Sequence, residues 1–377
     1  MTNSTPNSSL PERRHLRIGY LPLTDCAPLV AAVYLNIGER HGLTLELRQQ
    51  PSWAAIRDKL LSGELDAAQT LYGMVYGVQL GLGGPQADMA ILMTLNKNGQ
   101  AITVSNRLAQ LLQQHGSVTA AFAQLGRKPQ FAQTFPTGTH AMWLNYWLAS
   151  QGVHPLHDID NVVLPPPLMA EALAHGELDG FCAGEPWNAV AENNQCGRTL
   201  ISTSQIWPDH PEKALACRLE FSTLYPNTAL ALIRTILEAC QWLENPTNKI
   251  IASGWLAQAE FLNLPQQIIA SRMHSEASKA ASGLALKFFD DAAMNAPKPS
   301  DGLWFLSQFH RWGFLKSTDN WDGIVAKVCQ SAHYAQAASS LCMAAQPPTP
   351  TPVQFIDAQC WDGVHAIDYA QGFAIKA

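Results

Sequence analysis

Apolar and polar positions near the start of the chain follow two different periods. Residues 16–23 form a largely apolar run, which predicts a buried strand. Residues 25–42 carry apolar side chains at helical spacing and end at Gly42, whereas residues 43–50 alternate as a half-buried strand does. Strand, helix and strand in this order predict a parallel βαβ unit, the repeating element of α/β proteins.

The tetrapeptide GELD occurs twice, at residues 63–66 and again at 176–179. In both places a short amphipathic run precedes the glycine and a strand-like run follows, and Ser52 is the expected N-cap of the first helix. A glycine that ends a helix, followed by a polar turn into the next parallel strand, explains both copies as the same junction in two similar lobes. The alternative is chance recurrence of common turn residues.

Helical periodicity dominates much of the remaining chain. The expected helices cover residues 228–246, 255–262, 265–275 and 301–315. We therefore expect an α/β protein of two lobes, with a hinged ligand cleft at the carboxyl ends of their strands. The expected division is residues 15–104 plus 225–345 for lobe I, 105–224 for lobe II, and 346–377 for a Pro-rich linker and a C-terminal segment of unknown role.

Composition and charge narrow the class of protein. With 377 residues and 47% hydrophobic content, the chain can bury a large core. The formal net charge of -6 offers no basic excess for nucleic acid, and no apolar run reaches the roughly 18 residues of a membrane span, so neither partner is expected. The N-terminal residues lack the apolar stretch of an export signal, and the eight cysteines include no CxxC pair; both features predict a cytoplasmic protein with reduced thiols.

The common motifs of catalysis are missing from the sequence. It contains no GxSxG, HExxH or Walker sequence, and residues 81–86, GLGGPQ, lack the last glycine of a dinucleotide fingerprint. Residues 154–160, HPLHDID, group two histidines with two aspartates, which we interpret as a solvated loop rather than a metal cluster. We therefore expect no enzymatic activity, no cofactor and no metal.

Candidate ligand contacts combine a hydrogen-bond donor with a place at the end of a strand or the start of a helix. They are Trp53, Gln100, His140, Gly184 and Lys213. An indole, an amide, an imidazole, a backbone N–H and an ammonium group all donate, which suits an anion because each of its oxygens accepts. Structural alternatives remain open: a packing tryptophan, a turn amide, a core histidine and a solvent-facing lysine.

Two of these positions carry an electrostatic argument. His140 follows a Pro-Thr-Gly-Thr turn at the expected start of a helix, where free N–H groups and the helix dipole favour an anion. Pro211 fits the first position of another helix, so Lys213 is expected in that helix's first turn, where the dipole disfavours a cation. A bound anion would remove this conflict.

Six collinear blocks between residues 15 and 330 carry a family resemblance. They read LRIGYLPLTDCAPLVAA, SWAAIRDKLLSGELDAA, LNKNGQAITVS, FPTGTHAMWLNYWLASQGV, LDGFCAGEPWN and HPEKA. Together they resemble the nitrate- and bicarbonate-binding proteins of the NrtA and CmpA type. The resemblance implies the type II periplasmic-binding-protein fold and places a nitrate pocket on the five candidate residues. Bicarbonate binders of this family have an acidic residue and a metal near Lys213, so the lysine favours nitrate, or nitrite, as the ligand.

The sequence does not decide what anion binding accomplishes. Because no export signal is apparent, the chain resembles most the cytoplasmic nitrate sensors of the NasS type, which bind the RNA-binding antiterminator NasT until nitrate arrives. We therefore expect a sensor that releases a NasT-like partner and controls nitrate assimilation genes. The alternative is the substrate-binding component of an ABC-type nitrate transporter. An enzyme resembling the pyrimidine synthases of the same fold would need a Cys-rich and His-rich stretch, which the sequence lacks.

Overall fold

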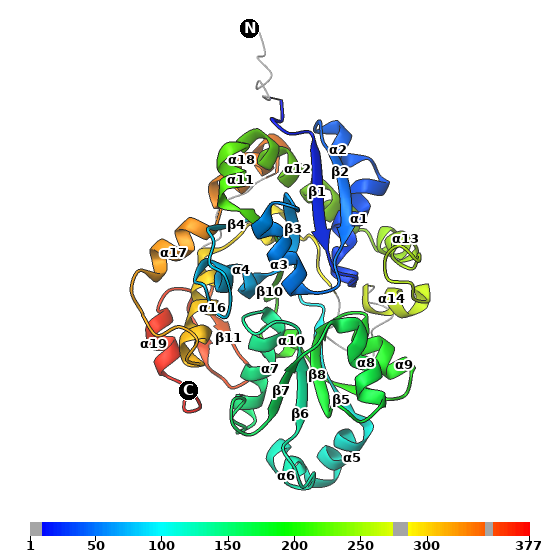
Figure 1. Ribbon diagram of the computed structural model, residues 1–377, viewed down its shortest axis with the longest axis vertical. Coiled ribbons are helices and arrows are strands. Elements are labelled where there is room, and N and C mark those ends of the chain that lie inside the picture. The colour runs from blue at the N-terminus through cyan, green and yellow to red at the C-terminus, as the bar shows by residue number, and fades with distance from the viewer. Residues whose placement is uncertain (1–9, 274–285, 344–349) are drawn as a thin grey trace.

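A computed structural model describes residues 10–273, 286–343 and 350–377 of the chain (Figure 1). Its strands form two five-stranded sheets, one above the other in the view of Figure 1, and one two-stranded sheet near the C-terminus. The first sheet has the order β2 (Thr44–Gln49), β1 (His15–Tyr20), β3 (Ala67–Leu71), β10 (Pro211–Arg218) and β4 (Met89–Lys97). The second has the order β7 (Asp160–Val163), β6 (Gln130–Gln133), β8 (Gly180–Gly184), β5 (Gln100–Ser105) and β9 (Gly197–Ser202). We call the elements around these sheets the first and the second lobe.

Helices cover both sheets, so the predicted two-lobed α/β fold is confirmed. Those of the first lobe are η1 (Thr24–Cys26), α1 (Ala27–Tyr34), α2 (Ile37–Arg40), α3 (Trp53–Ser62), α4 (Tyr72–Gln79), α11 (Leu219–Leu224), α12 (Pro226–Leu243), α13 (Pro246–Leu256), α14 (Gln266–Met273), α15 (Ala292–Asn295), α16 (Pro299–Arg311), α17 (Trp321–Val328) and α18 (Ser331–Ser340). Those of the second lobe are α5 (Asn106–His115), α6 (Val118–Ala123), α7 (Thr139–Ser150), α8 (Pro166–Ala174), α9 (Trp187–Asn193) and α10 (Thr203–Ile206). None of the described helices is both long and apolar enough to cross a membrane.

The two GELD sequences do the same structural work in both lobes. Gly63 and Gly176 adopt positive φ angles of 77° and 74° at the ends of α3 and α8, a conformation that favours glycine. The aspartate of the first copy, Asp66, accepts a hydrogen bond from the backbone N–H of Arg17 in β1 (2.8 Å). Asp179 of the second copy accepts one from Gln130 N at the start of β6 (2.7 Å). Each aspartate therefore fastens its own strand to the neighbouring parallel strand, which explains the repeat.

The chain crosses between the lobes twice, and the two crossings lie side by side. β4 ends in the first sheet and β5 begins in the second, with Asn98 and Gly99 between them, and the chain returns to β10 through residues 203–210. Asn98 Nδ2 donates to Asp209 Oδ1 (3.0 Å), and Asp209 N donates to Asn98 Oδ1 (3.1 Å). The expected boundaries placed most of β5 in lobe I and all of β10 in lobe II. In the structure β5 belongs to the second sheet and β10 to the first. The pattern of a strand does not reveal which sheet the strand joins.

Both five-stranded sheets are mixed, because the strand that follows each crossing runs antiparallel to its neighbours. β10 runs antiparallel between β3 and β4, and β5 runs antiparallel between β8 and β9. The lobes contact one another across the cleft. Thr24 N donates to the carbonyl of Glu185 (2.8 Å), and Trp187 Nε1 donates to the carbonyl of Pro22 (3.0 Å). The ends of β1 and β8 therefore meet where a ligand cleft was predicted.

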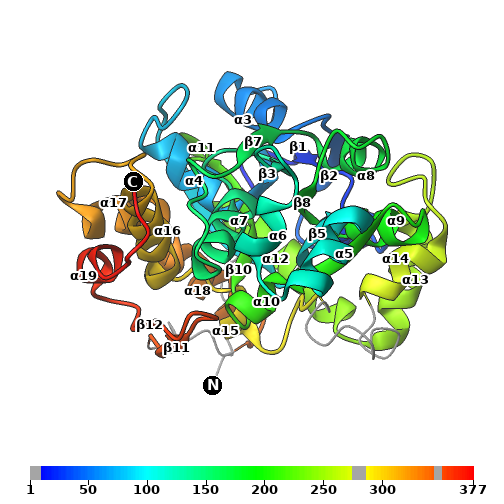
Figure 2. The same cartoon turned by 90° about the horizontal axis from the view of Figure 1, so that it is seen from below.

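The C-terminal segment packs on both lobes. Its elements are β11 (Val353–Gln354), β12 (Cys360–Trp361) and α19 (Ala366–Gln371), which lie near α16 on the side opposite α13 and α14 (Figure 2). The ring of Phe355 stacks on Trp304 of α16 at 5.8 Å and lies 4.9 Å from Tyr146 of α7. This segment therefore links a helix of each lobe, while the first residues of the expected linker, 346–349, lie outside the described residues.

Three expected helices differ in the structure. The run over residues 25–42 is divided into η1, α1 and α2, with Asn36 in a left-handed conformation between α1 and α2. The helix expected over residues 255–262 ends at Leu256, where α13 stops and turns follow. The helix expected to begin at Pro211 is instead the strand β10. Proline is compatible with the first residue of a strand as well as with the first turn of a helix, so its presence alone did not decide between them.

Candidate functional site

Lys213 lies fully buried between the lobes, with none of its side chain exposed to solvent. Its Nζ donates to Asp25 Oδ2 and to Glu212 Oε1, both at 2.9 Å. Although burial alone would lower it, the pKa of Lys213 lies above its ordinary value because the two carboxylates stabilise the ammonium form. The cation predicted at a helix start is therefore an interior charge on a strand, and two carboxylates rather than a helix dipole determine its environment.

A bulge in β10 brings two successive side chains to the same site. Neighbouring residues of a regular strand point to opposite faces of the sheet. Here Pro211 pairs with Lys97 and Lys213 pairs with the adjacent Asn96, so Glu212 is an extra residue in the strand. A bulge of this kind re-aims side chains, and it allows Glu212 and Lys213 to bond to each other.

Glu212 reaches across the cleft to the first turn of α7. Its carboxylate accepts hydrogen bonds from Thr139 Oγ1 (2.5 Å) and Trp143 Nε1 (2.9 Å), and its Oε1 lies 3.4 Å from His140 Nε2. Burial raises the pKa of Glu212, but the Lys213 charge and the contact with His140 outweigh it and leave the pKa well below its usual range. The anion expected at this helix N-terminus is therefore one of the protein's own carboxylates.

His140 connects two polar groups of the second lobe. Its Nε2 lies 3.0 Å from Gln100 Oε1, and its Nδ1 lies 2.6 Å from Thr134 Oγ1. A neutral ring that donates from Nε2 and accepts at Nδ1 satisfies both contacts. Burial, followed by the nearby Lys213 charge, lowers the pKa of His140, which agrees with the neutral form.

Gly184 allows the backbone of β8 to approach the site closely. It pairs with Gln100 across the β5–β8 ladder. A Cβ at this position would lie 2.8 Å from Gln100 Oε1 and 3.1 Å from a methyl carbon of Leu23. Any larger residue would therefore displace the amide of Gln100, which explains why this strand ends in glycine.

Trp53 is the first residue of α3, which Ser52 caps through a hydrogen bond from Ala55 N (3.2 Å). The indole is fully buried, and Lys213 Nζ lies 5.7 Å from the centre of its ring. Among the described residues, no group accepts a hydrogen bond from its Nε1. A buried donor without an acceptor is unusual and costs free energy, so this N–H is available to an acceptor brought by a ligand.

Asp25, which sequence reasoning missed, completes the group. It follows β1 in the 3-10 turn η1, is fully buried, and accepts hydrogen bonds from Gln69 Nε2 and, at 3.4 Å, from Gln100 Nε2. Burial raises the pKa of this carboxyl above its ordinary value, in spite of the opposing Lys213 charge. Glu212 was also missed, although it precedes Lys213, because a residue next to Lys213 in a regular strand or helix would point elsewhere.

The structure therefore brings all five predicted residues into one buried group and adds two carboxylates to it. Their charges are those of Lys213, Glu212 and Asp25, while His140, Gln100 and Trp53 contribute neutral polar groups. Among the described residues, no group of three or more His, Cys, Asp or Glu side chains has an arrangement that could bind a metal ion. Chemically, the group offers one ammonium, several neutral donors and one carboxyl whose proton affinity is raised.

Two lobes joined by two crossings, with polar side chains buried between them, define a ligand-binding protein of the type II periplasmic-binding-protein class. The chain belongs to the NMT1-like family, which matches residues 9–257. The crystal structure of the periplasmic nitrate-binding protein NrtA from Synechocystis superposes with a TM-score of 0.89 at 30% identity, covering 97% of this chain and all of that one. The predicted resemblance to the NrtA and CmpA type is thus confirmed.

Curated relatives fall into two lengths. The nitrate/nitrite binding protein NrtA of Synechococcus elongatus is 33% identical over 90% of this chain and 81% of its own length. The nitrate import ATP-binding protein NrtC of Synechocystis sp. is 34% identical over 88% of this chain, and the bicarbonate transport ATP-binding protein CmpC of Synechococcus elongatus is 33% identical over 97%. This chain matches only 51% and 55% of the length of these two ATP-binding proteins.

Proposed function

We propose that the chain binds nitrate, or nitrite, between its two lobes as the substrate-binding component of an ABC-type importer. Trp53, Gln100, His140, Gly184 and Lys213 contact the anion in this proposal. The names of the NrtA and NrtC relatives support the ligand and the transport role. The membrane components of such an importer would be the protein's partners.

The observation that carries the proposal is the unpaired indole N–H of Trp53 beside a buried ammonium group. A fully buried donor with no acceptor among the described residues calls for an acceptor from outside the chain. Lys213 places an ammonium group 5.7 Å from the ring centre of Trp53, and an anion can share this cation when Asp25, whose pKa burial raises, is neutral. A small oxyanion satisfies both groups at once.

Nitrate fits the neutral donors of the second lobe because it carries no proton near neutral pH and only accepts hydrogen bonds. Neutral His140 donates from Nε2, and the amide of Gln100 can donate once its Nε2 turns from Asp25. Bicarbonate carries an O–H that needs an acceptor, and Asp25 is the acceptor that the site could offer. The donors of the site alone do not decide between nitrate and bicarbonate, so a binding experiment is needed.

Titration calorimetry with nitrate, nitrite, bicarbonate and sulfate tests the proposal. We expect saturable one-to-one binding of nitrate that survives EDTA and no saturable binding of sulfate, and the nitrite titration measures the preference between the two nitrogen oxyanions. Tighter binding of bicarbonate than of nitrate, or loss of nitrate binding in EDTA, would contradict it.

The sensor role and its NasT-like partner remain predictions, as do a cytoplasmic location and the absence of enzymatic activity. Size-exclusion chromatography of this chain with a NasT-type antiterminator separates the sensor from the transport proposal. A complex that forms without nitrate and dissociates in millimolar nitrate would support the sensor. No complex under either condition would support transport.

A further inference from the structure

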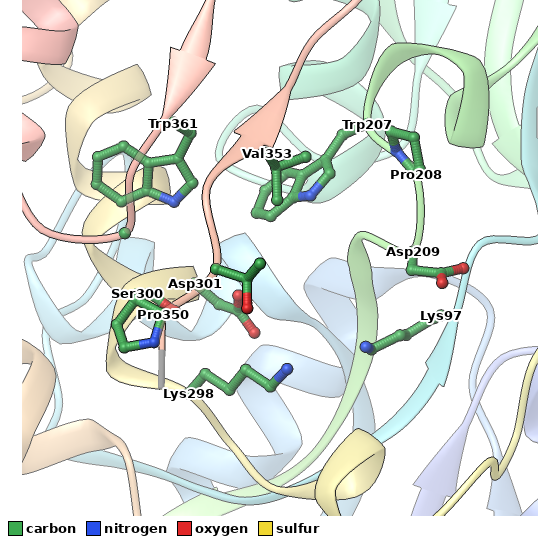
Figure 3. Close-up of a pocket in the computed structure, with 12 residues that line it drawn as sticks. Lys97, Trp207, Pro208, Asp209, Lys298, Ser300, Asp301, Pro350, Val353 and Trp361 are labelled. Carbon is green, nitrogen blue, oxygen red and sulfur yellow. The ribbon is translucent and has the colours of Figure 1, made fainter. Parts of the chain in front are cut away.

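A cavity of about 170 Å³ lies against the two crossings and outside the group around Lys213. Five side chains from distant parts of the sequence dominate its walls: Lys97 at the end of β4, Trp207 before β10, Lys298 and Asp301 at the start of α16, and Trp361 in β12 (Figure 3). We call it the crossing pocket. The C-terminal segment closes one side of it, because Pro350 and Gly363 also line the cavity.

The polar end of the crossing pocket has an excess of positive charge. Figure 3 shows the side chains of Lys97 and Lys298 pointing toward Asp301. In the described part of the chain, neither lysine makes a hydrogen bond or an ion pair through its ammonium group, whereas Asp209 on the same wall is paired with Lys287 at 2.7 Å. Two ammonium groups therefore lie near the carboxylate of Asp301 without pairing with it, and both remain able to donate to a ligand; Asp209 and Asp290 also stabilise the charge of Lys97.

Burial disfavours the charged forms of both Lys97 and Asp301, whereas the nearby helix adds positive potential. Burial, together with the charge of Lys298, lowers the pKa of Lys97, so an added anion would stabilise its ammonium form. Burial raises the pKa of Asp301 to about 6, in spite of the two lysines, which weakens its ability to neutralise them. The N-terminus of the 13-residue helix α16 has no side-chain cap and adds partial positive charge at the same wall.

The other end of the crossing pocket is apolar and aromatic. Trp207 and Trp361 are only 4% and 2% exposed, and Val353, Pro208 and Pro350 lie beside them. An apolar cavity of roughly 150 Å³ is large enough for a benzene ring. A pocket with one polar end and an apolar body orients a ligand that has the same two parts.

We propose that the crossing pocket binds a small aromatic monocarboxylate, with its carboxylate between Lys97 and Lys298 and its ring against Trp207 and Trp361. The ligand would contact both crossings, the start of α16 and the C-terminal segment at once. This site is separate from the proposed nitrate site and does not depend on it.

Benzoate is the probe for a first test, titrated into the full chain while tryptophan fluorescence and heat are recorded, with and without excess nitrate. We expect saturable one-to-one binding that nitrate does not displace. Lys298→Met should weaken benzoate binding about ten-fold or more, because it removes a charge-assisted hydrogen bond. Lys316→Met, which removes an exposed lysine away from the pocket, is the matched control and should bind like the unchanged chain. Melting temperatures of both variants establish that they fold.

Benzamide and acetate separate the two parts of the proposal. Benzamide keeps the ring without the charge, and acetate keeps the charge without the ring, so each should bind at least about ten-fold more weakly than benzoate. Displacement of benzoate by nitrate would place the probe in the site between the lobes and would overturn the proposal. So would unchanged benzoate binding by a folded Lys298→Met variant, equal binding of acetate, or no saturable binding of benzoate.

Discussion

The two lobes contribute different chemistry to the site between them. The first lobe supplies every charge, with Asp25 following β1 and with Glu212 and Lys213 on β10. The second lobe supplies the neutral groups His140 and Gln100 and the close backbone of Gly184. The difference indicates a division of labour, in which the first lobe supplies the charged groups of the site and the second lobe supplies its neutral hydrogen-bonding groups.

Because the charged site residues of the first lobe are buried, each of them must have a partner. A buried ammonium or carboxylate is tolerated only with partners, because removal from water costs several kcal/mol per ion. Lys213 has two carboxylates, and Glu212 has donors on α7 in addition. The neutral groups of the second lobe cost less to bury, so substitutions in the two lobes should differ in size.

The largest effect is expected for Lys213→Ala, which removes the only cation of the group. Nitrate affinity should fall on the order of 100-fold, because a charge-assisted hydrogen bond in a buried site contributes about 1.5–3 kcal/mol. The free energy of unfolding should also fall by about 3–5 kcal/mol, since two buried carboxylates lose their partner. Calorimetry and urea unfolding measure the two effects, with Lys316→Ala as the control. Unchanged affinity in a folded variant would remove Lys213 from the site.

The next largest effect is a dependence of nitrate affinity on pH, which Asp25 of the first lobe should cause. Burial raises the pKa of Asp25, so this carboxyl is neutral at low pH and becomes charged as pH rises through that raised value. A bound monoanion beside Lys213 favours the neutral form, so nitrate affinity should fall as pH rises, by up to about ten-fold per pH unit. The window lies above the ordinary aspartate value of about 3.9.

Other titratable groups that face Asp25 do not compete for this role. The pKa of His140 is lowered by burial, and the pKa values of Lys213 and Cys26 are raised, by its two carboxylates and by burial respectively. The Lys213 charge and His140 keep the pKa of Glu212 low in spite of its burial. Asp25→Asn should therefore bind nitrate with an affinity that no longer falls as the pH rises above the ordinary aspartate range. A slope that persists in this variant would show that another group takes up the proton.

His140→Ala tests the second lobe. It should weaken nitrate binding about ten-fold, since one neutral donor contributes roughly 0.5–1.5 kcal/mol and the partners Gln100 and Thr134 are left with fewer contacts. A loss as large as that of Lys213→Ala, measured by the same calorimetry, would abolish the contrast between the lobes.

The smallest effect is expected for Trp53→Phe, which keeps the aromatic ring and removes only the indole N–H. Because this donor is neutral although it belongs to the first lobe, affinity should fall only about three-fold to ten-fold. Fluorescence is unsuitable for this variant, so calorimetry is the measurement. A 100-fold loss would show that membership of the first lobe, rather than charge, determines the size of the effect.

Sequence patterns predicted the local features of the fold and of the site. The N-cap Ser52, the glycine after each amphipathic run and the strand that ends at Gly184 depend on neighbours in the chain, and all are present in the structure. The strand β10 and its bulge depend instead on pairing with β3 and β4, which no local pattern records. For the same reason Asp25 and Glu212 escaped notice: the partners of Asp25 are distant in sequence, and Glu212 bonds to its neighbour Lys213 only because of the bulge.

The two margins of the contact between the lobes are held together by different forces. On one margin, Arg272 of α14 forms an ion pair with Glu192 of α9, and the Glu192 side chain is 38% exposed. The Nε of Arg272 also lies 3.6 Å from Glu185 Oε1. On the other margin, α7, α16 and the C-terminal segment meet through aromatic rings such as Trp143 and Trp304. Dissolved ions screen the first kind of contact and leave dispersion between rings unchanged. Rising ionic strength should therefore separate the two lobes first along the margin of Arg272. The aromatic margin should stay in contact and act as the axis of opening.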